Sequence, residues 1–241
     1  MVLEPSQHNV LVIIPAFNEE TTIRSVLSSI RDLYPEFDIA VIDDGSTDQT
    51  VGEVQKTDAT LIQHPFNLGY GSAIQTGYMY AEGKSYDYLV QIDGDGQHDP
   101  RSLVDLLSPV VQNEADITLG SRFIKAKSYK PSFFRISGIL VLRFMTFVLC
   151  GVRISDPTTG YQAMNMKVMK LFCSPYFPKD YPDADVIILL KMADLRFKEV
   201  AVTMYESIDN KSMHSGLAHS LYYMFKMILS MLLMRFRKIK A

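Results

Sequence analysis

The sequence predicts an α/β fold with a doubly wound, mostly parallel sheet flanked by helices. Apolar strand-like runs alternate with amphipathic helical runs, and polar clusters follow the strands where such sheets bind ligands. The 241 residues are 47% hydrophobic and 21% charged, which is enough for one substantial core near the upper size of a single domain.

The first strand and helix establish this alternation. Residues 10–14 form an uninterrupted apolar run typical of a buried strand, and residues 21–33 have helical periodicity. The apolar residues on one face of that helix are Ile23, Val26, Leu27, Ile30 and Leu33. Further strands are predicted at 38–42, 60–63, 86–92 and 117–120, and further helices at 47–56, 71–81 and 100–112.

Polar clusters follow three of these strands, at residues 15–19, 43–46 and 93–95. Because the carboxyl ends of parallel strands meet at one edge, we expect the clusters to converge there. Helix capping alone accounts for Asn18 and Glu19. Capping does not account for Asp43 and Asp44 together with the acids after residue 92, whose charges repel unless a cation or sugar hydroxyls engage them. The clusters together therefore predict a ligand site.

Residues 93–98 read Asp-Gly-Asp-Gly-Gln-His and directly follow a buried strand. Asp93, Asp95 and Gln97 thus present hard oxygen ligands together, a set that suits Mg²⁺ or Mn²⁺ holding a substrate's phosphates. An EF-hand starting at Asp93 would need Gly and Glu where the chain has His98 and Val104. A GxxxxGK[ST] phosphate loop is absent from the sequence, and residues 69–74 lack the third glycine of a dinucleotide loop.

Composition and termini limit the partners and the compartment. The formal net charge of −3 gives no general electrostatic attraction for nucleic acid. The two cysteines fit neither a disulfide framework nor a paired metal motif, which indicates a reducing compartment. Residues 1–9 lack the basic start and apolar centre of a signal peptide, and a clean transmembrane run is not found. We therefore expect a cytoplasmic protein.

Six motifs, at residues 13–19, 42–48, 67–71, 93–98, 120–122 and 156–161, resemble family 2 glycosyltransferases of the GT-A fold in order and spacing. Together they are similar to the branch that makes polyprenyl-phosphate sugars, such as dolichyl-phosphate mannose synthases. The resemblance covers residues 10–215. It implies a GT-A catalytic domain over residues 1–215, with a nucleotide-sugar half at 1–123 and an acceptor half at 124–215.

The resemblance also implies roles for particular residues. It assigns the nucleotide sugar to Pro15, Ala16, Asn18, Glu19, Asp44, Gly71, Asp93 and Gly94. Asp95 and Gln97 would hold the Mg²⁺ or Mn²⁺ ion on the donor diphosphate. Arg122 is the candidate for the acceptor phosphate, joined by Arg135, although an Arg paired to a nearby acid looks the same. Asp156 is the candidate base or orienting group, although Asp before Pro also opens turns.

The activity implied is an inverting transfer of a hexose, with UDP-glucose as the donor, onto undecaprenyl phosphate or a similar polyprenyl phosphate. A GDP-sugar donor stays open, as do a saccharide hydroxyl of a lipid-linked glycan as acceptor and a non-catalytic scaffold that binds nucleotide sugar or lipid. Relatives carry an Arg and a Gly before a Ser-Lys or Ser-His pair, but residues 207–214 here lack that Arg. Lys211 or His214 would have to supply the diphosphate contact instead.

The C-terminal segment, residues 216–241, is predicted to be an amphipathic basic helix at a membrane interface. Residues 210–241 contain six Lys or Arg and no acid. An apolar stripe runs through Leu217, Leu221, Phe225, Ile228 and Leu232, widened by Tyr222, Met224, Leu229 and Met231. We expect peripheral binding to the anionic cytoplasmic face of a membrane, with residues 136–152 beside the helix. The alternative is a core or homo-oligomer helix with a solvated basic tail.

Overall fold

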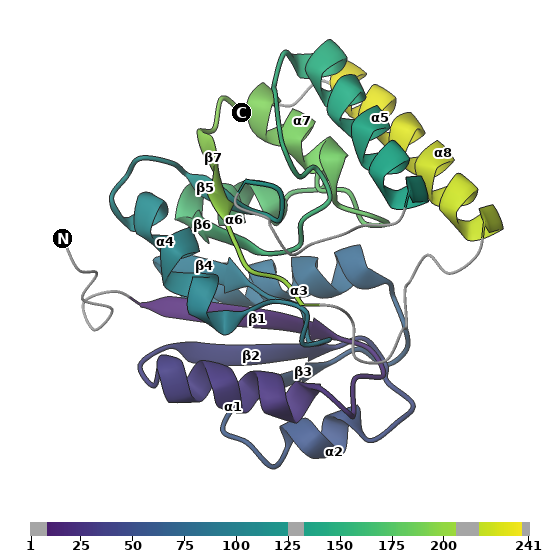
Figure 1. The fold of residues 1–241 in the computed structure, drawn as a ribbon. Coiled ribbons are helices and arrows are strands. Elements are labelled where there is room, and N and C mark those ends of the chain that lie inside the picture. Colours follow the sequence, from purple (N-terminus) through teal and green to yellow (C-terminus); the bar gives the residue numbers. More distant parts are fainter. Residues whose placement is uncertain (1–8, 125–132, 206–216, 238–241) are drawn as a thin grey trace.

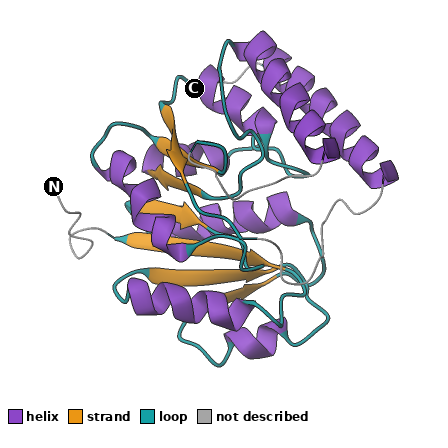
Figure 2. Cartoon of the chain, viewed as in Figure 1, coloured by secondary structure: helices purple, strands orange, loops and turns teal. Residues whose placement is uncertain are grey.

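The computed structural model describes residues 9–124, 133–205 and 217–237. Within them the strands form one seven-stranded sheet in the order β3-β2-β1-β4-β6-β5-β7. The strands are β1 Val10–Ala16, β2 Asp38–Asp43, β3 Thr60–Gln63, β4 Tyr88–Gln91, β5 Ile117–Ser121, β6 Gln162–Asn165 and β7 Phe197–Ala201. Figure 2 shows this sheet as a central layer between helices.

Helices cover both faces of the sheet because each buried strand is apolar on both sides. Leu11 and Ile13 face one core cluster, while Val10, Val12 and Ile14 face the other, the period of two expected of a strand. The cluster with Leu11 and Ile13 is covered by α3 Tyr70–Gly83, α6 Met166–Phe172 and α7 Ala184–Met192. The cluster with Val10, Val12 and Ile14 is covered by α1 Ile23–Leu33, α2 Thr50–Val54 and α4 Leu103–Val111. The predicted doubly wound α/β fold is confirmed.

The sheet is mostly parallel, with one antiparallel strand. β1 lies parallel to both β2 and β4, β2 to β3, and β5 to β7. β6 runs antiparallel to its two neighbours, β4 and β5. Since β2 and β3 extend the sheet on one side of β1 and β4 on the other, the winding reverses between β1 and β4, which is where such sheets bind ligands.

The predicted helix boundaries shift for local reasons. The helix predicted from residue 47 begins only at Thr50, because Asp48 accepts hydrogen bonds from the Thr50 amide and hydroxyl. The helix predicted over 100–112 starts as a single 3₁₀ turn, η2 Pro100–Ser102, before α4. Asp99 caps that turn by accepting a hydrogen bond from the Arg101 amide.

An outer layer is formed by α5 Phe133–Cys150 and α8 Leu217–Phe236, which lie side by side outside α7 (Figure 1). Met227 and Met231 of α8 are buried against the core, with 1% and 0% of their surface exposed. On the opposite face Leu221 and Phe225 are 63% and 66% exposed. Among the described helices, none has the length and apolar character needed to cross a bilayer.

Candidate functional site at the winding reversal

The loops after β1, β2 and β4 are joined at one rim, as predicted. The Asn18 amide donates to Ser46 Oγ at 2.9 Å, and the Thr47 amide donates to Asn18 Oδ1 at 2.8 Å. The Thr22 hydroxyl donates to the Gly94 carbonyl at 2.8 Å, which brings in the loop after β4. Asn18 has a φ of +56°, a left-handed conformation that Asn tolerates. In this structure Asn18 therefore holds two loops together.

Asp44 organises the loop that leads into α3. Its carboxylate accepts hydrogen bonds from the amides of Leu68, at 2.9 Å, and Gly69, at 2.8 Å. His64 Nδ1 lies 2.7 Å from Asp44 Oδ1, and His64 Nε2 lies 2.9 Å from Thr76 Oγ1. The Asp44 side chain is only 5% exposed. Donors within the chain thus satisfy this carboxylate, and its contact with a nucleoside stays a prediction.

The predicted small residues bring the backbone close together at the rim. Pro15 and Ala16 are buried at the end of β1. A Cβ on Gly94 would lie 3.3 Å from the Pro15 carbonyl oxygen, so a side chain there would press on β1. A Cβ on Gly71 would overlap the Lys179 backbone. Both glycines therefore permit close packing of the walls of the site.

Asp93 lies at the base of the site, and its side chain is 26% exposed. The Tyr70 hydroxyl donates to Asp93 Oδ1 at 2.9 Å, and His98 Nε2 lies 3.8 Å from Asp93 Oδ2. Burial raises the pKa of Asp93 to about 6, against lowering by Tyr70 and Arg122. Burial also lowers the pKa of His98 to about 4, so this ring is neutral near pH 7. His98 Nδ1 accepts from the Asp93 amide at 3.1 Å, which places the ring proton on Nε2.

Asp95 and Gln97 lie against each other, as the spacing predicts. The Gln97 amide donates to Asp95 Oδ1 at 2.9 Å, and Gln97 Nε2 donates to Asp95 Oδ2 at 2.6 Å. Burial and the nearby Asp93 raise the pKa of Asp95. Within the described residues, no three His, Cys, Asp or Glu side chains are grouped as a complete metal centre. The oxygens of Asp95 and Gln97 nevertheless fit a Mg²⁺ or Mn²⁺ ion that takes its remaining ligands from substrate phosphates and water.

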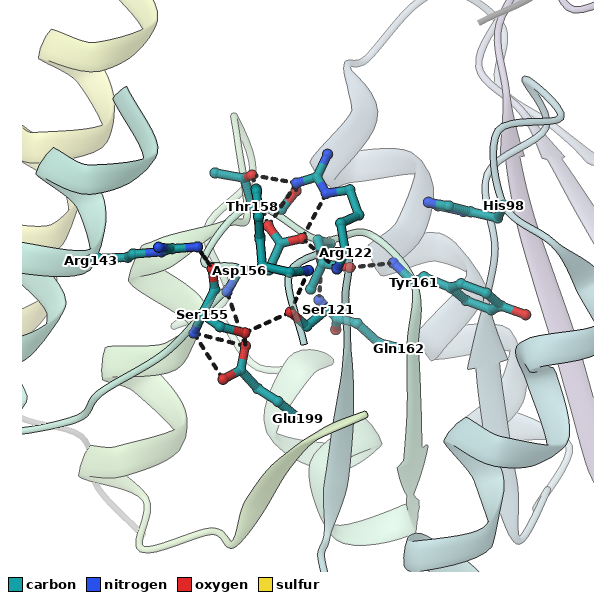
Figure 3. A network of polar contacts seen from close by, with 12 residues as sticks. His98, Ser121, Arg122, Arg143, Ser155, Asp156, Thr158, Tyr161, Gln162 and Glu199 are labelled. Atoms are coloured by element: carbon teal, nitrogen blue, oxygen red, sulfur yellow. Dashed lines mark hydrogen bonds and ion pairs between the residues drawn. The ribbon is translucent and has the colours of Figure 1, made fainter. Parts of the chain in front are cut away.

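Arg122 and Asp156 form a buried ion pair (Figure 3). Arg122 Nε donates to Asp156 Oδ2 at 2.6 Å, and Nη2 donates to Oδ1 at 2.7 Å. Nη2 also donates to Thr158 Oγ1 at 2.9 Å. Arg122 is 6% exposed and Asp156 is 0% exposed. This two-pronged pairing supports the orienting role predicted for Asp156, because both of its oxygens are committed to the guanidinium.

Glu199 and Arg143 hold the loop that carries Asp156 in place, and the sequence did not predict these contacts. Glu199 of β7 accepts from the Ser155 hydroxyl at 2.6 Å and from the Asp156 amide at 2.9 Å. Arg143 of α5 donates to the Ser155 carbonyl (Figure 3). The Arg143 guanidinium also lies 4.8 Å from the Phe123 ring centroid. Glu199 lies 43 residues from Asp156, so no local pattern could link them.

Two acids at the start of α7, the partly buried Asp183 and the buried Asp185, were also missed from the sequence. Asp183 accepts from the Tyr223 hydroxyl of α8 at 2.6 Å, and Asp185 accepts from the Ser230 hydroxyl. Burial raises the pKa of Asp183 to about 6 and that of Asp185 to about 7. The charge of Arg122 lowers the pKa of Asp183, and the charges of Asp156 and Asp93 raise it.

Three predicted positions lie wholly or partly outside the described residues. The backbone of Arg135 belongs to α5, but its side chain is outside the described part of the chain. Lys211 and His214 fall in the undescribed range 206–216. Their roles stay predictions.

Residues 11–172 match the model of the family described as Glycosyl transferase family 2. The chain belongs to this family. It is 31% identical over 220 residues to undecaprenyl-phosphate mannosyltransferase of Micrococcus luteus. This match covers 86% of this chain and 88% of the relative. It is 28% identical over 217 residues to UDP-N-acetylglucosamine–dolichyl-phosphate N-acetylglucosaminyltransferase of Methanococcus voltae, covering 81% of this chain and 86% of the relative. These similarities confirm the predicted family.

Solved structures agree on the fold. Glucosyl-3-phosphoglycerate synthase from Mycobacterium tuberculosis, in complex with Mn²⁺, UDP and phosphoglyceric acid, has a TM-score of 0.72 and 21% sequence identity to this family 2 chain. The match covers 99% of this chain and 82% of that one. At this identity the likeness concerns the fold alone, and it confirms the predicted GT-A architecture.

Proposed function

We propose that this glycosyltransferase moves a hexose from a nucleotide sugar onto the phosphate of a polyprenyl lipid, with UDP-glucose as the donor and undecaprenyl phosphate as the acceptor. The observation that carries the proposal is one site holding both an acidic cluster and a guanidinium. Asp93 and Asp95 lie in the loop after β4, and the charge of Arg122 lowers the pKa of Asp93. The named activities of the two relatives, both on polyprenyl phosphates, support the acceptor class.

On the donor side, Asp95 and Gln97 would hold the Mg²⁺ or Mn²⁺ ion. When bound, that ion supplies positive charge that stabilises the departing nucleoside diphosphate. The rim residues Asn18 and Glu19, with the close-packed backbone at Pro15 and Gly94, form the walls against which the nucleoside lies.

On the acceptor side, Arg122 binds the lipid phosphate and Asp156 keeps its guanidinium fixed. A phosphate monoester has a second pKa of about 6, so the attacking oxygen is already largely ionised near neutral pH. The acceptor therefore needs positioning more than deprotonation. Transfer to a saccharide hydroxyl would instead need a base. The commitment of both Asp156 oxygens to Arg122 favours the phosphate over that alternative acceptor.

We also propose that residues 1–215 are the catalytic domain and that the outer layer rests on the cytoplasmic face of a membrane. The outward residues of α5 and α8 are apolar: Ile136, Leu140, Val141, Phe144, Phe147, Val148, Leu221, Phe225, Leu229, Leu232, Leu233 and Phe236. Arg235 and Arg237 are exposed at the end of α8. An apolar face edged by cations matches anionic lipid. A homo-oligomer through this face is the competing prediction.

The reaction is tested by incubating the protein with Mn²⁺ or Mg²⁺, radiolabelled UDP- and GDP-sugars, and undecaprenyl phosphate. We expect label in the organic phase only when the cation is present. Label appearing on a saccharide acceptor in preference to the lipid phosphate would replace the proposed acceptor. Binding of nucleotide sugar without any transfer would favour the scaffold.

Asp95→Ala tests the metal-holding role. We expect transfer to fall by roughly 100-fold or more, because charge on the leaving group loses its stabilisation. Asp105→Ala, which removes an exposed acid on α4, is the matched control and should transfer at the normal rate. Near-normal turnover by Asp95→Ala would remove Asp95 from the reaction.

A further inference from the structure

The hydroxyl of Tyr70 joins two hydrogen bonds at the base of the site. Tyr70 is the first residue of α3, and its hydroxyl donates to Asp93 Oδ1 at 2.9 Å. The same oxygen accepts from Gln91 Nε2 at 2.9 Å. Gln91 Oε1 in turn accepts from the Tyr78 hydroxyl. These contacts form a chain, Tyr78 to Gln91 to Tyr70 to Asp93, in which each donor and acceptor is determined by its neighbours.

The first two members of the chain are buried, so their hydrogen bonds are costly to lose. Tyr78 and Gln91 are each 1% exposed, and a buried polar group without a partner is costly. Burial and the charge of Asp93 raise the pKa of Tyr70 well above its usual value. Tyr70 therefore keeps its proton near neutral pH and serves Asp93 as a donor only.

A third segment closes over this contact. A Cβ on Gly160 would lie 2.6 Å from the Tyr70 hydroxyl and 3.1 Å from Asp93 Oδ2. The loop between Asp156 and β6 thus passes so near that only glycine fits. Tyr70 thus holds one oxygen of Asp93, while His98 Nε2, at 3.8 Å, and the Gly160 segment lie near the other and limit the orientations of the carboxylate.

We propose that Tyr70 is a positioning residue, whose hydroxyl holds the Asp93 carboxylate in the orientation that meets the bound nucleotide sugar. This inference rests on the proposed function, because it takes Asp93 as a donor-site residue. Without the hydroxyl, Asp93 Oδ1 loses its hydrogen bond, and repulsion from the nearby Asp95 then favours another orientation of the carboxylate. Tyr70 then acts through Asp93 and does not touch the reacting atoms.

Tyr70→Phe tests the proposal by deleting one oxygen and keeping the ring. We expect the affinity for UDP in the presence of Mn²⁺, measured by calorimetry, to fall by roughly 10-fold to 100-fold, the usual effect of a lost hydrogen bond to a charged group. The KM for the nucleotide sugar should rise in parallel, while the KM for the lipid phosphate stays unchanged. Wild-type affinity and KM in this variant would overturn the proposal.

Tyr86→Phe is the matched control, because it also deletes a buried tyrosine hydroxyl, but one that donates to Asp38 and lies outside this chain. It should lower the melting temperature but leave UDP affinity within about twofold. An equal loss of affinity in both variants would mean that the hydroxyls act only through general stability. Gly160→Ala is a second route, since its methyl group would displace the Tyr70 hydroxyl, and it should weaken UDP binding with Tyr70 present.

A crystal structure of Tyr70→Phe without ligands separates this inference from the proposed function. The Asp93 carboxylate should be turned away from its wild-type position, and an unchanged carboxylate would refute positioning by Tyr70. If the wild-type protein binds no sugar nucleotide, the proposed donor chemistry fails. The position of Asp93 in the variant still decides whether Tyr70 orients it.

Discussion

The interpretation of Arg122 depends on its partner, Asp156, which only the structure identifies. The sequence predicts it as a phosphate ligand, with pairing to a nearby acid as the alternative. The structure contains that pair, but Asp156 is fully buried instead of lying at the surface. Two hydrogen bonds to Asp156 hold the guanidinium in one orientation, and a fixed orientation is what the proposed contact with a phosphate needs.

Removing Asp156 should therefore destabilise the protein. Asp156→Ala leaves the buried Arg122 without a counter-charge, and we expect the free energy of unfolding to fall by about 3–5 kcal/mol. Urea denaturation measures this change. The double variant Arg122→Met with Asp156→Leu should recover much of the loss, because it leaves no unpaired charge. If Asp156→Ala unfolds at the wild-type urea concentration, the ion pair has no structural role.

The hydrogen-bond partners of Asp44 could not be predicted from the residues next to it in the sequence. Adjacent acids at a sheet edge suggest uncompensated charge, yet backbone amides of Leu68 and Gly69 compensate Asp44. The repulsion that predicts a cation is therefore concentrated on Asp93 and Asp95. Sequence spacing cannot reveal this, since the amides lie 24 and 25 residues away.

At the scale of elements, α8 has two apolar faces, one packed on the protein and one exposed. The inner face packs on the protein through Tyr223, Met227, Met231 and Met234. The outer face carries Leu221 and Phe225, which belong to the stripe predicted from the sequence. Met231 also belongs to the predicted stripe but is buried. The inner face thus confirms the core alternative, while contact of the outer face with a membrane stays a prediction.

The two faces should respond differently to substitution. Replacing Leu221 and Phe225 together by Ser should weaken binding to anionic vesicles by roughly tenfold or more, because apolar area leaves the lipid. The free energy of unfolding should change by no more than about 0.5 kcal/mol for each exposed substitution. Vesicle flotation and urea denaturation measure the two effects.

Met227→Ala is the inner-face control. It should cost about 2–5 kcal/mol of stability by leaving a cavity, with vesicle binding unchanged for the folded protein. Normal flotation of the double Ser variant would contradict membrane contact through the outer face. A loss of self-association in that variant would instead support the oligomer.

At the scale of the whole molecule, buried acids make stability depend on pH. The pKa of Asp185 is raised to about 7 by burial, whereas an Asp in the unfolded chain titrates near 3.8. The folded state therefore binds this proton more tightly, and the stabilisation is complete below pH 3.8 and lost as the pH rises through 7. Asp183, with a pKa raised to about 6, acts in the same direction. His98, with a pKa lowered to about 4, opposes them as the pH falls.

Asp185→Asn isolates one of these groups. The amide carries no charge, so the wild-type protein should gain about 2 kcal/mol relative to the variant when the pH is lowered from 7.5 to 5. Urea denaturation of both proteins at the two pH values measures this difference. A constant difference would show that Asp185 is ionised in the folded state throughout the range.

The sequence alone determined the order of strands and helices in the first half, the convergence of three polar loops, and the placing of Asp95 beside Gln97. Each follows from a local rule, such as strand and helix periodicity or the shared edge of parallel strands. The amide and side-chain bonds between the Asn18 loop and residues 46 and 47 bear this out.

Only the tertiary structure decided the antiparallel insertion of β6, the pairing of Arg122 with Asp156, and the contact of Tyr70 with Asp93. These partners lie 34 and 23 residues apart along the chain. Which distant side chains meet depends on the path of every loop between them and on the space left after the core has packed. Local sequence patterns predict neither the loop paths nor this remaining space. The side-chain contacts of the site are therefore determined by tertiary packing.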